Sequence, residues 1–112
     1  MFSEDILKQF LERFDKNKHQ KMIDVYIISF KNHLTSCQTA ITEQDLTTLK
    51  SSSHDLKSLC RTLGALNEGH LAEKIEKHLK DDQEDAALCH IDALLEQIEY
   101  ILEIMDNYTV SS

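Results

Sequence analysis

The sequence predicts an all-α protein, specifically an antiparallel four-helix bundle with an additional short N-terminal helix. The chain has no proline and only two glycines, too few turn residues for a β-sandwich or an α/β fold. Apolar residues recur at spacings of three and four along five segments, which is the period of amphipathic helices. With 112 residues and 41% apolar content, residues 1–112 should form a single helical domain around one core.

The first segment, about 3–14, has five apolar residues on one side and ends at "DKNK", residues 15–18. The second, about 20–37, contains the run "VYII", whose β-branched residues would also suit a strand. Its helical spacing continues on both sides of that run, so a helix is favoured. Its apolar side is formed by Ile23, Tyr26 or Ile27, Phe30, Leu34 and Cys37.

The third segment, about 42–63, begins where Thr42 and Asp45 resemble a capping box. Gly64 stands where a residue with left-handed backbone would end the helix. Apolar or small residues between these signals alternate in steps of three and four, which favours packing against other helices at small crossing angles. This stripe consists of Leu46, Leu49, Ser53, Leu56, Cys60 and Leu63.

The fourth and fifth segments, about 66–80 and 83–106, continue the same pattern. The aspartates of the link "DDQED" suit the start of the fifth helix by capping and by charge. The final "NYTVSS" is expected to be a frayed tail. Short links between long helices favour antiparallel neighbours, so the last four helices should form the bundle and the first should cover one end.

Charge and composition exclude several functions. A net charge of −8 argues against bulk nucleic-acid binding and against attachment to an anionic membrane surface. The longest apolar run, 25–28, is far too short to span a membrane, and the acidic N-terminus is unlike a signal peptide. We therefore expect a cytoplasmic protein. Met1 and the complete helix set favour a free-standing protein, and stripes used up in one bundle favour a monomer.

The three cysteines lack a C-x-x-C spacing and fall on the apolar stripes. Buried free thiols in a reducing compartment are the expected state of Cys37, Cys60 and Cys89.

One histidine of the third segment should point into solvent. With Leu56 at the centre of the buried stripe, a rotation of 100° per residue places His54 about 160° away. On the same scale Arg61 lies near 140°, Lys50 near 120° and Lys57 near 100°. The outer face is completed by small polar residues, namely Thr47, Ser51 and Ser58.

This face is cationic in an acidic protein. Residues 46–64 contain three cations and one anion, for a net charge of +2, whereas the other residues carry −10. An imidazole in water is largely neutral at pH 7, so a ring nitrogen can act as a nucleophile. Lysines can neutralise a phosphoryl group, whose transfer depends mostly on positioning and charge. The pattern suits a histidine that accepts a phosphoryl group, although an exposed histidine and solvated lysines are also common without any function.

The sequence here resembles the histidine phosphotransfer (HPt) domain family, whose signature is His-x-Leu-Lys-Gly with a further glycine ten residues after the histidine. The matching residues are His54, Leu56, Lys57 and the pair Leu63-Gly64. The similarity covers about residues 20–80. It implies that His54 is the phosphorylated residue and that Lys57 stabilises the phosphoryl group. Ser58 departs from the family's usual glycine but is still small.

The resemblance also implies a partner and a role. The partner would be the receiver domain of a response regulator or hybrid sensor histidine kinase, and His54 would relay a phosphoryl group between receiver aspartates in a multistep phosphorelay. The protein would have no kinase activity, no cofactor and no metal of its own, and any Mg²⁺ would belong to the receiver. Angle and charge make Lys50 and Arg61 candidates for docking or for contact with the phosphoryl group, and Ser51 and Ser58 are docking candidates as small residues of the same face.

Three alternatives stay open at this point. "SHDLKSL" also resembles the phosphoacceptor helix of a dimeric sensor histidine kinase, but that motif normally has proline where Leu59 stands. A regulatory bundle could bind a receiver without being phosphorylated. A metal-binding bundle is disfavoured, because no histidine follows a carboxylate by three residues, His70 and His78 are two turns apart, and Cys89 and His90 diverge by about 100°.

Overall fold

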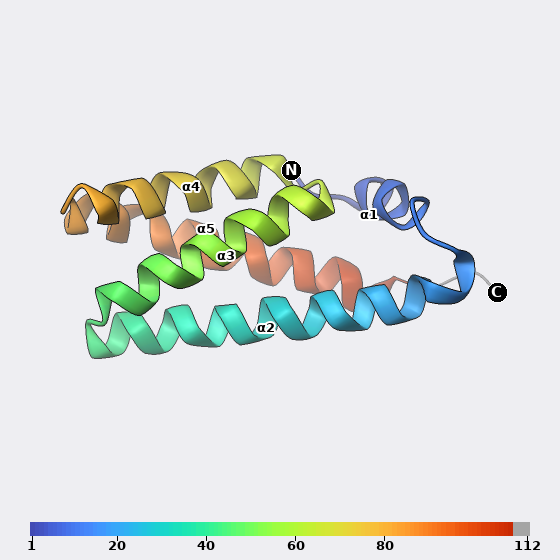
Figure 1. Ribbon diagram of the computed structural model, residues 1–112, viewed down its shortest axis with the longest axis horizontal. Helices are drawn as coiled ribbons and strands as arrows, with labels where there is room; N and C mark the ends of the chain where they lie inside the picture. Colours follow the sequence, from blue (N-terminus) through green and yellow to red (C-terminus); the bar gives the residue numbers. More distant parts are fainter. Residues whose placement is uncertain (109–112) are drawn as a thin grey trace.

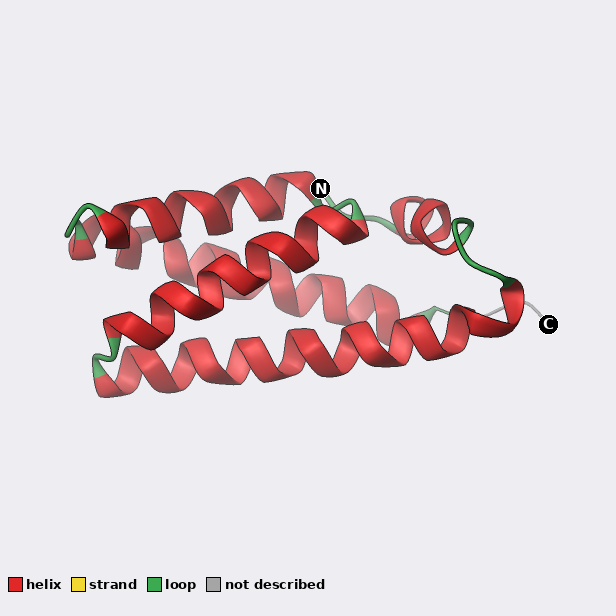
Figure 2. Ribbon diagram, in the orientation of Figure 1, coloured by secondary structure: helices red, strands yellow, loops and turns green. Residues whose placement is uncertain are grey.

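Five α-helices and one short 3-10 helix follow one another in the computed structural model, which describes residues 1–108 (Figure 1). No strand occurs among these residues, so the predicted all-α class is confirmed (Figure 2). The expectation of a frayed tail concerns residues 109–112, which lie outside the described part. The elements are α1 (Glu4–Leu11), the 3-10 helix (Lys16–Lys18), α2 (His19–Glu43), α3 (Leu46–Leu63), α4 (Leu66–Lys80) and α5 (Glu84–Asn107).

The four long helices form the bundle. Each of α2, α3 and α4 packs against the helix that follows it, and α5 returns to α2, so the four enclose one core. The short links make consecutive helices antiparallel (Figure 1). Helix α1 lies at one end of α3, where it packs against α3 and α5. No helix of residues 1–108 is long and apolar enough to cross a membrane.

The core follows the predicted stripes, with one exception among the cysteines. Cys37 and Cys60 are fully buried, and this burial raises the pKa of their thiols to about 11 and about 12. Cys89 is exposed, so the prediction of a third buried thiol is wrong. The buried side of α5 is centred on residues such as Ala87 and Leu94, and a position two residues after Ala87 is rotated about 200° from it.

The boundary between α2 and α3 differs from the predicted one. Helix α2 continues to Glu43, because Ala40 is buried and prolongs the apolar stripe beyond Cys37. Gln44 then adopts left-handed backbone, with φ of 56°. Asp45 caps α3 and accepts a hydrogen bond from the backbone N–H of Thr48 at 3.1 Å. The third helix therefore begins at 46 rather than 42.

Two other predicted helix starts and ends shift as well. Helix α1 ends at Leu11 instead of about 14, although Phe14 still packs edge-on against Phe10 with ring centroids 5.3 Å apart. Gln83 occupies the cap position of α5 and makes no side-chain capping bond, so capping by the linker aspartates is wrong. The predicted favourable charge at the start of α5 is present, because Glu84 and Asp85 lie in its first turn.

Gly64 ends α3 as predicted and also fixes where α1 lies. Its φ of +94° is the left-handed region, and Ala65 donates its backbone N–H to the carbonyl of Cys60 at 2.8 Å. A side chain on Gly64 would bring its Cβ within 2.9 Å of Ile6 Cγ2. The missing side chain therefore lets α1 approach the end of α3, while the middle of α3 keeps its outer face open.

Candidate functional site

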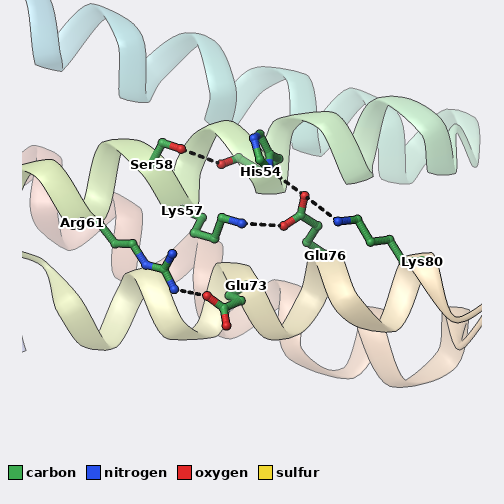
Figure 3. A network of polar contacts seen from close by, with 7 residues as sticks. All are labelled: His54, Lys57, Ser58, Arg61, Glu73, Glu76 and Lys80. Carbon is green, nitrogen blue, oxygen red and sulfur yellow. Dashed lines mark hydrogen bonds and ion pairs between the residues drawn. The ribbon is translucent and has the colours of Figure 1, made fainter.

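His54 lies halfway along α3 on the outer face, and its side chain is 55% exposed. Ser51 and Ser58, one turn before and after it, are exposed too. The Ser58 hydroxyl donates to the His54 carbonyl at 3.4 Å, so it turns back toward its own helix (Figure 3). The predicted exposure of this ring is confirmed, and the surface around it is built from small side chains.

A carboxylate on the neighbouring helix α4 holds the imidazole from below. Glu76 Oε2 lies 2.7 Å from His54 Nδ1, and Glu76 Oε1 lies 2.9 Å from Lys57 Nζ (Figure 3). The Glu76 side chain is only 7% exposed. Lys80, one turn later on α4, places its Nζ 3.8 Å from the same Oε2. One buried carboxylate thus contacts both residues that the sequence motif singled out.

The charge state of Glu76 follows from these contacts. Burial by itself raises the pKa of this carboxyl. Hydrogen bonds from Lys57 and His54, together with their charges, outweigh that effect and bring the pKa below its ordinary value of 4.5. Glu76 is therefore ionised at neutral pH and acts only as an acceptor. When the imidazole is neutral, its proton must then lie on Nδ1, which leaves the Nε2 lone pair free.

The cations of this face are less available than the sequence suggested. Lys57 is only 17% exposed, because its ammonium turns toward Glu76 rather than into solvent. Arg61 pairs with Glu73 of α4 (Figure 3). Lys50 is half-buried and has no ion pair among the described residues. Two of the three predicted cations are thus already matched by carboxylates from α4.

Glu76 and Lys80 were missed by the sequence reasoning. Glu76 follows Ile75 and stands four residues after Ala72, so it lies at the edge of the apolar stripe of α4, an unusual place for a carboxylate. That position was a usable signal for a partnered charge. Its partner could not be named, because the sequence does not specify how α4 is rotated against α3.

Within residues 1–108 no group of three or more histidine, cysteine or carboxylate side chains is placed to hold a metal ion. His78 does approach His90, with nearly parallel rings whose centroids are 5.8 Å apart, but the pair lacks a third ligand. The alternative of a metal-binding bundle therefore gains no support from the described residues.

The described residues thus form a helical bundle with an exposed imidazole on α3 whose Nδ1 is held by a buried carboxylate of α4. The sequence model of the Hpt domain matches residues 21–103, from α2 to the last turns of α5, and the chain belongs to this family. It is also 26% identical over 107 residues to the phosphorelay intermediate protein rdeA of Dictyostelium discoideum. That match covers 96% of this chain but 42% of the relative, so the chain spans less than half of that protein's length. No solved structure matches the chain significantly.

Proposed function

We propose that this protein carries a phosphoryl group on His54 Nε2 and exchanges it with the aspartate of a receiver domain in a multistep phosphorelay. The observation that supports this role best is the exposed ring whose Nδ1 is bound to the buried Glu76 carboxylate at 2.7 Å. Family membership supports the same conclusion.

The bonds and charges of the transfer balance without any reactant other than the two proteins. The Nε2 lone pair of neutral His54 attacks the phosphorus of the receiver's aspartyl phosphate in line, the N–P bond forms, and the P–O bond to the aspartate breaks. The aspartate leaves as a carboxylate. The phosphorylated ring keeps its Nδ1 proton and becomes cationic, and Glu76 stabilises that positive charge through the same hydrogen bond. The same reaction in the opposite direction transfers the phosphoryl group from His54 to the aspartate of a second receiver.

Lys57 and Lys80 take different parts in this scheme. Lys57 holds Glu76 at 2.9 Å and is mostly buried, so it fixes the carboxylate that in turn fixes the ring. Lys80 is 59% exposed and only 3.8 Å from Glu76, so its ammonium can turn toward a phosphoryl group on His54. The role predicted for Lys57 is thus divided between two lysines in this scheme. Lys57 positions the Glu76 carboxylate, and Lys80 neutralises the charge of the phosphoryl group.

The receiver approaches over the small residues of α3. Ser51 and Ser58 leave room on both sides of the ring, and Lys50 and Arg61 lie at the edges of the contact. The phosphoryl group comes from a receiver of a response regulator or hybrid sensor kinase, since a carrier of this kind has no kinase activity of its own. Any Mg²⁺ belongs to the receiver. The protein acts as a monomer in this scheme.

The experiment uses acetyl phosphate to phosphorylate a panel of receiver domains from the same organism, each of which is then incubated with this protein. We expect one receiver to deliver acid-labile, alkali-stable phosphate to the wild type and to His70→Gln, a matched variant of an exposed histidine on α4. His54→Gln should acquire none while keeping its helical circular dichroism spectrum. A receiver that binds but never transfers would instead identify a regulatory bundle. Phosphate gained only from a kinase domain and ATP would identify a kinase acceptor helix.

A further inference from the structure

A groove at the end of α3 combines positive charge with an apolar lining. It has a volume of about 450 Å³ and lies where α1 meets the junction of α3 and α4. The charged side chains that line it are two arginines, Arg13 and Arg61. The remaining lining is apolar or uncharged, namely Ile6, Gln9, Phe10, Thr62, Leu63, Gly64 and Leu66.

The grooves along α5, by contrast, are lined by acidic side chains. A groove of about 490 Å³ there is lined by Glu96, Glu99 and Glu103, and a neighbouring one by Glu4 and Glu103. In a chain of net charge −8 these acidic surfaces are ordinary. The groove at the end of α3 is lined by two arginines and no carboxylate, so its electrostatic complement is an acidic side chain.

The charge of Arg13 is available to such a partner. Arg13 has no carboxylate within 4.0 Å among the residues that the structure describes, in contrast to Arg61, which pairs with Glu73. Its guanidinium carbon lies 5.8 Å from the centre of the Phe10 ring, and one nitrogen donates to the Thr62 carbonyl at 3.5 Å. A guanidinium has five N–H donors, so most of them face solvent. Leu66, 60% exposed on the rim, adds an apolar contact.

The groove falls within reach of a protein seated on His54. Arg61 follows His54 by seven residues, which is about 10 Å along the helix with a rotation of about 20°. A transient interface covers about 600 Å² on each partner, equivalent to a disc of about 14 Å radius. A receiver centred on His54 therefore extends over Arg61 to the groove between α1 and α3.

We propose that this groove receives an acidic side chain, flanked by an apolar one, from the docking face of the receiver domain, and that Arg13 pairs with it. The inference rests on the proposed phosphoryl transfer through His54 and adds a contact that selects among receivers. Arg13 touches neither the ring nor the phosphoryl group. Its pairing changes how readily a receiver docks, and the rate within the docked complex stays the same.

The test measures phosphoryl transfer from the receiver that phosphorylates wild-type His54 fastest, at increasing receiver concentration. Arg13→Glu should raise KM about tenfold or more with kcat within about twofold. Arg13→Gln keeps a donor for Thr62 and should give a smaller rise, about threefold. Lys18→Glu makes the same charge change outside the groove and should match the wild type. A scan of Asp or Glu to Lys over the receiver's surface should contain one substitution that restores transfer to Arg13→Glu.

The outcomes distinguish the proposed docking groove from the proposed phosphoryl transfer through His54. If Arg13→Glu and Lys18→Glu have the same KM as the wild type, the groove is not part of the interface, although His54 still carries phosphate. If Arg13→Glu lowers kcat and the thermal midpoint together while Arg13→Gln behaves as the wild type, the residue has only a structural role. If no receiver phosphorylates the wild type, the relay itself is refuted, and the docking groove with it.

Discussion

The ion pair between Lys57 and Glu76 should contribute measurably to stability, unlike a pair on an open surface. Replacing Lys57 with methionine keeps most of the apolar stem and removes the ammonium 2.9 Å from a carboxylate that is only 7% exposed. Breaking a fully buried pair costs about 3–5 kcal/mol. Lys57 is itself 17% exposed, and His54 and Lys80 remain within 4 Å of the carboxylate, so about 2–3 kcal/mol is expected here.

Urea denaturation followed by circular dichroism at 222 nm measures this cost. With a slope of about 1.5–2 kcal/mol per molar urea, the midpoint of Lys57→Met should fall by about 1–2 M. Adding Glu76→Gln removes the stranded charge and should restore at least half of the lost stability. Lys8→Met breaks the exposed pair with Glu4 at 3.7 Å and serves as the matched control, with little effect expected. A loss for Lys57→Met no larger than this control would refute the argument.

Three further predictions concern the same site and its support. Because pairing lowers the pKa of Glu76 below 4.5, its ionised form stabilises the fold above that pH and the contribution disappears as the pH falls through the lowered value. Urea midpoints between pH 6 and 3 should therefore fall more steeply for the wild type than for Glu76→Gln; parallel curves would contradict this. Ser58→Leu should block receiver docking without loss of helicity, and unchanged transfer would mean that the receiver approaches from elsewhere. Leu56→Ala should cost about 2–5 kcal/mol in urea unfolding as a truncation in the core, where a loss below 1 kcal/mol would be inconsistent with its complete burial.

The helices themselves were largely predictable, because each is specified by neighbours in the sequence. The spacing of apolar residues placed α4 at 66–80 and α5 within one residue of its observed ends. The left-handed Gly64 was equally local. The errors occurred where long-range packing extends or shortens a helix: α2 runs on because Ala40 is buried against the bundle, and α1 stops early although Phe14 stays packed.

Only part of the functional site could be predicted from the sequence, because the rest depends on packing between helices. The exposure of His54 follows from the rotation of one helix relative to its own apolar stripe, and it was predicted correctly. The environment of Lys57 depends on Glu76, nineteen residues away on another helix. The sequence therefore could not show that this lysine, counted on the cationic outer face, is mostly buried. The exposed Cys89 thiol shows that even a local stripe can be misread, because a residue two positions after the buried Ala87 is rotated about 200° from it.

The sequence alone determined that this chain is a bundle of helices, which helix presents an imidazole to solvent, and which small and basic residues share its face, because periodicity within one helix settles all three. Only the tertiary structure decided which nitrogen of that imidazole is free and where the cations turn. Those properties depend on how α4 is rotated against α3, and that rotation is set by the fit of many side chains across the core rather than by any local motif.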